Sequence, residues 1–94
     1  MHEMGVACSV LEAVHRELRS YPGQRASKVG LRIGEFAGVD PESLRFCFEV
    51  MVKSSEPAPL ALEIEWRRGE HGRRGDELEI AYLELEEIPA EVLT

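Results

Sequence analysis

The sequence predicts an α+β fold in which two helices pack on one face of a three-stranded mixed sheet, as a single small domain over residues 1–94. Two segments repeat apolar residues at helical spacing, and three segments alternate apolar with polar residues. The predicted order is helix, strand, helix, strand, strand. Because a helix connects the first two strands, these strands can run parallel, and this makes the sheet mixed.

The first helix is expected between Met4 and Tyr21, where one face is apolar and the other is charged. The dipeptide Pro22-Gly23 ends it, because proline and glycine both interrupt helices. The first strand is expected over residues 28–33, whose odd positions are branched and apolar and whose even positions are polar or glycine. The apolar positions of the helix are Met4, Ala7, Val10, Leu11, Val14 and Leu18.

The second helix is expected to begin at Asp40-Pro41-Glu42. Asp40 can accept hydrogen bonds from the free amides of the first turn, proline suits the first helical position, and Glu42 favours the positive end of the helix dipole. The expected core side of this helix carries Leu44, Cys47, Phe48 and Met51.

Two further strands are expected over residues 60–66 and 78–86. In the second of these the apolar positions change parity between Tyr82 and Leu83, which predicts a β-bulge near Ala81-Tyr82. We expect these two strands to form an antiparallel hairpin closed by the loop Arg67–Gly75.

The N-terminal residues Met1-His2-Glu3 supply a set of nitrogen donors. The terminal amine, the His2 imidazole and the backbone amides of His2 and Glu3 can surround one metal ion. Planar nitrogen-rich sites suit Ni(II) or Cu(II). We expect Met1 to be retained, since removal of the initiator generally needs a small second side chain.

Three blocks in order carry a family resemblance: Met1-His2-Glu3, the segment 28–35 ending Ile-Gly-Glu, and the segment 38–49. Together they resemble the HypA/HybF family of hydrogenase nickel-incorporation proteins, and residues 76–87 resemble that family's last strand. The resemblance implies an N-terminal nickel-binding domain with Met1, His2 and Glu3 as metal ligands, and it makes Asp40 a candidate further ligand. As a helix N-cap, however, Asp40 is explained without any metal.

The zinc domain of that family, with its two Cys-x-x-Cys pairs, is missing. Its place between the last two strands holds only residues 67–75, and Cys8 and Cys47 are too far apart in sequence to form such a pair. A structural zinc site needs four ligands. We therefore expect Ni(II) but no zinc, and zinc-linked control of nickel binding does not carry over.

Other candidate residues have simpler interpretations. His71 could bind a metal between subunits but is more often a solvated loop residue, and His15 is expected to be an ordinary exposed helix residue. The four arginines of the 67–75 loop could bind an acidic partner or a phosphate, or could keep a hairpin tip polar. Cys47 is expected to act as a small core residue, beside which Cys8 lies. The arginines are Arg67, Arg68, Arg73 and Arg74.

Composition excludes several functional classes. The net charge of −7 argues against general nucleic-acid binding, and no apolar run is long enough to cross a membrane. No secretory signal is visible, so a cytoplasmic location is expected, where two cysteines stay as free thiols. No catalytic constellation of nucleophile and base can be placed, so we do not expect an enzyme.

The resemblance to the HypA/HybF family implies a nickel metallochaperone that delivers Ni(II) to a [NiFe]-hydrogenase precursor. By resemblance its partners are a nickel-maturation GTPase and the hydrogenase large-subunit precursor, and the exposed sheet edges leave a homodimer open. The alternative is a metal-free adaptor that docks on a maturation partner. An adaptor should tolerate loss of His2, whereas a nickel carrier should not.

Overall fold

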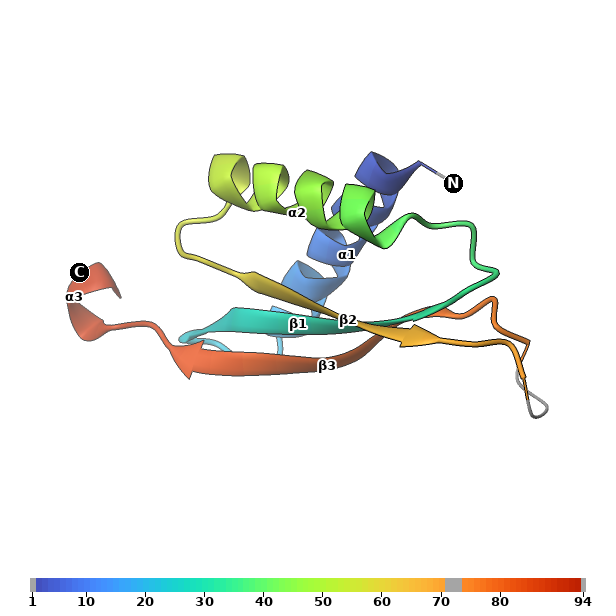
Figure 1. Ribbon diagram of the computed structural model, residues 1–94. Helices are drawn as coiled ribbons and strands as arrows, with labels where there is room; N and C mark the ends of the chain where they lie inside the picture. The colour runs from blue at the N-terminus through green and yellow to red at the C-terminus, as the bar shows by residue number, and fades with distance from the viewer. Residues whose placement is uncertain (1, 71–73, 94) are drawn as a thin grey trace.

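The structure is a computed structural model that describes residues 2–70 and 74–93. The order of elements is α1 (Glu3–Leu18), β1 (Gln24–Gly34), α2 (Pro41–Ser55), β2 (Ala61–Arg67), β3 (Leu78–Glu87) and the short α3 (Ala90–Leu93). α1 and α2 lie on the same side of the three-stranded sheet, which leaves its other side open (Figure 1). The predicted fold class is confirmed. Among the described residues no helix is long and apolar enough to span a membrane.

The sheet has the strand order β2-β1-β3, with β1 at its centre. β2 runs parallel to β1, as the helical crossover predicts, and β3 runs antiparallel to β1. The prediction that the last two strands form a hairpin is therefore wrong. Strands that are neighbours in sequence pair only in about two-thirds of cases, and here β3 crosses to the far side of β1.

The core lies between β1 and the two helices. Val29, Leu31 and Ile33 of β1 are at most 1% exposed and face the helices. α1 contributes its apolar stripe to this core, and α2 contributes Leu44 and Phe48, which are also almost fully buried. The periodicities that predicted these elements therefore correspond to the buried faces.

Two register shifts interrupt the β1–β3 ladder. On β3, Ile80 pairs with Leu31 and Tyr82 pairs with Gly30, so Ala81 is the extra residue of a bulge. The bulge at the predicted position is confirmed. Because one extra residue moves the following side chains to the opposite face, Tyr82 faces the open side of the sheet, whereas Leu83 packs against the core.

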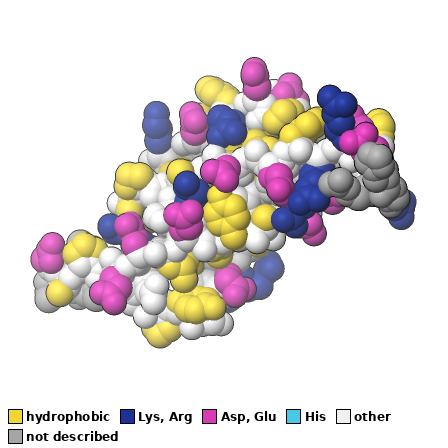
Figure 2. Space-filling view, turned by 60° about the horizontal axis from the view of Figure 1, so that its bottom comes forward, with side chains coloured by type: hydrophobic (Ala, Val, Ile, Leu, Met, Phe, Trp, Pro, Cys, Tyr) yellow, Lys and Arg dark blue, Asp and Glu magenta, His cyan; other side chains and the backbone are white. Residues whose placement is uncertain are grey.

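The open side of the sheet is organised by charge. The cations of β1 lie between glutamates of both neighbouring strands: Lys28 bridges Glu63 and Glu84, and Arg32 bridges Glu65 and Glu79. Figure 2, turned so that this side comes forward, shows basic and acidic side chains interspersed with hydrophobic ones. Each such exposed pair contributes little stability alone, but together the pairs place acidic side chains on both sides of the β1 cations.

The chain between β2 and β3 is held at its base. Residues 34–36 hydrogen-bond to both arms: the amide of Glu35 donates to the Arg67 carbonyl, and the amide of Phe36 donates to the Gly75 carbonyl. A Cβ added at Gly75 would lie 2.7 Å from the Gly69 Cα, so the two arms touch there. Residues 71–73, and with them His71 and Arg73, lie outside the described residues.

Gly30 is required by its neighbour on β3. A Cβ at this position would overlap the Tyr82 ring, whose hydroxyl donates a hydrogen bond to Glu63 at 2.7 Å. That bond raises the pKa of Tyr82 to about 12, because ionisation would remove the donor.

We predict that Gly30→Ala lowers the free energy of unfolding by about 1–3 kcal/mol, the usual cost of overpacking. Chemical denaturation would measure it. In a Tyr82→Ala background the same substitution should cost clearly less. An equal cost in both backgrounds would contradict the role assigned to the ring.

Candidate metal centre at the helix N-termini

His2 is the residue that precedes α1. Its backbone is extended (φ −79°, ψ 113°), and its carbonyl accepts the amide of Val6 at 3.0 Å, which starts the helix. No side chain caps this end of α1. The amides of the first helical turn have no backbone partner within the helix, as at every helix start. The Glu3 amide is one of them, and it interacts with the carboxylate of its own side chain. The His2 side chain is exposed, and Met1 lies outside the described residues.

The Glu3 side chain connects the start of α1 to the start of α2. Its Oε2 accepts the backbone N–H of Asp40 at 3.0 Å. This hydrogen bond is the main reason why the pKa of Glu3 is lowered, and the amide of Glu3 itself contributes. The carboxylate of Glu3 is therefore directed to the start of α2.

Asp40 caps α2 as predicted. Its Oδ1 accepts the amides of Glu42 (3.0 Å) and Ser43 (3.4 Å), and its Oδ2 accepts the Ser43 hydroxyl at 3.2 Å. Both carboxylate oxygens are thus engaged within the cap. Asp40 nevertheless lies beside the N-terminal residues, because its own amide is the one that Glu3 holds.

The two helices consequently begin at the same end of the molecule (Figure 1). A second polar contact joins them at the other end, where His15 Nε2 lies 2.9 Å from a carboxylate oxygen of Glu56, the residue that follows α2. The sequence did not predict this role for His15. Its distance of 41 positions from Glu56 gives no local signal.

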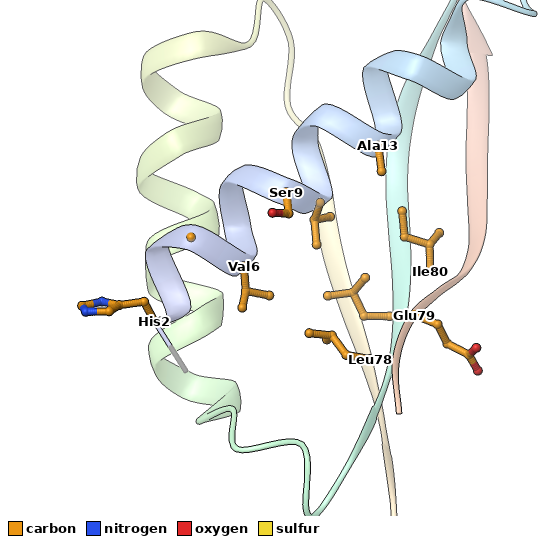
Figure 3. A pocket seen from close by; sticks show the side chains of 10 residues that line it. His2, Val6, Ser9, Ala13, Leu78, Glu79 and Ile80 are labelled. Atoms are coloured by element: carbon orange, nitrogen blue, oxygen red, sulfur yellow. The ribbon is translucent and has the colours of Figure 1, made fainter. Parts of the chain in front are cut away.

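A mostly apolar hollow lies beside the start of α1. It has a volume of about 570 Å³ and lies between α1 and the strands β1 and β3. Figure 3 shows His2 at its mouth, with the imidazole directed away from it, while Val6 and Ala13 line the interior. Its walls are mostly apolar, so it offers few ligand atoms for a cation. The lining residues are His2, Gly5, Val6, Ser9, Val10, Ala13, Leu31, Leu78, Glu79 and Ile80.

The remaining candidates that the structure describes do not come together in a site. Over residues 2–70 and 74–93 no group of three or more His, Cys, Asp or Glu side chains is placed to hold a metal. Cys47 packs against the core as expected, and Cys8 on α1 donates a 3.5 Å hydrogen bond to Glu12, which raises the pKa of the Cys8 thiol. Arg67 pairs with Glu65, and Arg74 pairs with Asp76.

Comparison with known proteins identifies the family. Residues 1–72 match the profile described as "Hydrogenase/urease nickel incorporation, metallochaperone, hypA". The chain belongs to the HypA family. A hydrogenase maturation factor HypA from Pelodictyon phaeoclathratiforme is 42% identical over 69 residues, which is 73% of this chain and 59% of that protein.

Two other HypA maturation factors are also similar to most of this chain. That from Methanopyrus kandleri is 46% identical over 73% of this chain and 49% of its own length. That from Chlorobium luteolum is 40% identical over 81% of this chain and 64% of its own length. The chain thus spans roughly half to two-thirds of the HypA relatives it matches. No solved structure shows significant similarity to it.

The Glu3 contact generates a pH prediction. Because the folded-state pKa of Glu3 is lowered, its contribution to stability is present above the unfolded pKa, near 4.5, and is lost as pH falls through the folded value. Glu3→Gln keeps a neutral acceptor for the Asp40 amide. We therefore expect the unfolding free energies of wild type and Glu3→Gln to differ at neutral pH and to converge in acid. Urea titrations across that range would test this, and a constant difference would contradict it.

Proposed function

We propose that this HypA-family chain binds one Ni(II) ion at its N-terminus and transfers it to the precursor of a nickel enzyme. The donors are the Met1 amine, the His2 imidazole and the backbone amides of His2 and Glu3. The observation that carries the proposal is the arrangement around Glu3: its side chain is held by Asp40, while its backbone amide lies at the uncapped start of α1.

The helix terminus favours this donor set. The N-terminus of a helix carries a partial positive charge, which opposes a bare cation and stabilises negative charge. Two deprotonated amides carry two negative charges, which balance the two positive charges of Ni(II). The planar complex therefore adds no net charge at the helix terminus. Because the amide protons must leave, affinity should rise with pH.

Asp40 serves this site as an anchor. Oδ1 of Asp40 accepts the Glu42 and Ser43 amides, and Oδ2 accepts the Ser43 hydroxyl. Ligation of a metal through Oδ1 would compete with both amide hydrogen bonds, and loss of such a cap costs about 1 kcal/mol. Through its amide, Asp40 holds Glu3 and thereby the backbone of the first turn. The donors nearest the chain end can then detach one at a time as the acceptor's ligands arrive.

The delivery partners follow from the family. We propose a nickel-maturation GTPase and the large-subunit precursor of a [NiFe]-hydrogenase, with transfer by ligand exchange in the cytoplasm and without catalysis. We also propose that residues 67–75 take the place of the zinc domain in a single domain over residues 1–94. Its only two cysteines, on α1 and α2, offer half the ligands that a four-coordinate zinc site needs. A homodimer stays a prediction.

The central test is a Ni(II) titration of protein with a native N-terminus, followed by calorimetry and visible absorption. We expect one equivalent to bind with a square-planar spectrum and His2→Ala to abolish it. His15→Ala is the matched control, since it removes an exposed imidazole that lies beside Glu56 at the far end of the helices. Binding that survives His2→Ala would overturn the proposal, and absence of binding would leave the metal-free adaptor.

A second prediction separates the terminal amine from Asp40. One residue added before Met1 moves the terminal amine away from the other donors. Asp40→Ala removes the side chain that caps α2 but keeps the backbone amide that Glu3 accepts. The added residue should therefore weaken Ni(II) binding more than Asp40→Ala does. Calorimetry of both variants, with circular dichroism to confirm that each is folded, would decide. Equal effects on affinity would contradict the proposed donor set.

A further inference from the structure

β3 is an edge strand with an unusual charge pattern. Among the described strands it pairs with β1 alone, so one row of its backbone N–H and C=O groups faces outward. Residues 76–94 include seven acidic and no basic residues. An unprotected strand edge is a template for the addition of another strand, and its side chains decide which strand fits.

The charge pattern across the sheet specifies that strand. On the open side, Glu63 and Glu65 of β2 flank cations of β1, and those cations are flanked on the other side by glutamates of β3. The sign therefore alternates from strand to strand: acidic, basic, acidic. A strand that continues the pattern beside β3 presents basic side chains on this side. The β3 glutamates that meet β1 cations are Glu79, Glu84 and Glu86.

On the helix side of β3, an added strand would need apolar side chains instead of basic ones. A hollow of about 480 Å³ lies between β3 and the second half of α1. Its β3 side is mostly apolar, and α1 adds Arg16 and Glu17 to its lining. Tyr21 and Ile80, which line it, are 43% and 36% exposed. Leu83 and Leu85 pack against the core, whereas Tyr21 and Ile80 leave apolar surface exposed beside the edge. Apolar side chains of an added strand would point into it, because successive residues alternate between faces.

Two features show which part of which edge strand can accept another strand. The extra residue Ala81 disrupts the outer edge of β3. The second register shift places its extra residue, Ser27, on β1, so β3 itself continues without an extra residue over Leu83–Glu87. On β2, Arg45 from α2 donates a 2.7 Å hydrogen bond to the Leu62 carbonyl, which occupies backbone of that edge. β2 is also shorter, with seven residues against ten for β3.

We propose that the free edge of β3 over Leu83–Glu87 binds an extended segment of another protein whose side chains alternate between apolar and basic. An edge strand from a second copy of this chain does not suit this edge of β3. Both of its edge strands carry glutamates on the open side, and like charges directly opposite each other destabilise a strand pair. The occupant is therefore a basic strand from a different protein, and its binding does not require nickel.

The test uses metal-free protein and a fluorescent peptide of about eight residues that alternates valine and lysine. We expect saturable binding that weakens with salt, together with slower amide hydrogen exchange confined to the outward amides of Leu83–Glu87. A peptide that alternates valine and glutamate should not bind. Binding without protection of these amides, or equal binding of the glutamate peptide, would overturn the proposal.

A matched pair of variants locates the site. Glu84→Gln/Glu86→Gln removes two open-side carboxylates from β3, and Glu63→Gln/Glu65→Gln removes two from β2; each of the four pairs with a β1 cation. The β3 variant should bind the lysine peptide about fivefold more weakly at low salt, as expected for the loss of two surface ion pairs. The β2 variant should bind as wild type does. Equal weakening would show that only net charge attracts the peptide, and the proposal would fail.

Discussion

The central strand β1 is the constraint on which the rest of the structure depends. Its alternate residues are buried apolar side chains that face the helices on one side and cations on the open side. Every other element is placed by this alternation: the helices cover Val29, Leu31 and Ile33, and both edge strands supply glutamates to the basic residues. Even Tyr82 lies where it does because Gly30 leaves room for its ring. A one-residue slip of β1 would reverse both faces at once.

The proposed metal centre depends on a different feature, the meeting of two helix starts. α1 begins without a side-chain cap, whereas α2 begins with a fully used one. Glu3 couples these unequal ends through the Asp40 amide. The uncapped end keeps backbone donors available, and the capped end supplies a rigid support for them. For the proposed nickel carrier this combination would leave the donors able to exchange while the Glu3–Asp40 contact holds the first turn in place.

Local patterns predicted the elements well, and long-range pairing was harder to predict. The helix start at Asp40-Pro41 and the bulge at Ala81 follow from signals within a few residues, and both are confirmed. The prediction that the last two strands are neighbours was wrong, because sequence adjacency says little about which edge of β1 a strand joins. The stronger signal was charge: β1 carries cations that need acidic residues on both sides. The Glu3–Asp40 and His15–Glu56 contacts span 37 and 41 positions, and no local pattern reports such distances.

The touching arms at Gly69 and Gly75 have a consequence for how this fold can evolve. Since the backbone hydrogen bonds of residues 34–36 already hold both arms together, the cost of closing the chain there is met by the sheet itself. The cost of a longer loop grows only slowly with its length. Whatever is spliced between the two glycines starts and finishes at nearly the same point in space, so a few residues or a whole folded module can be exchanged there while β2 and β3 keep their register. The fold can therefore accommodate insertions of very different length between Gly69 and Gly75.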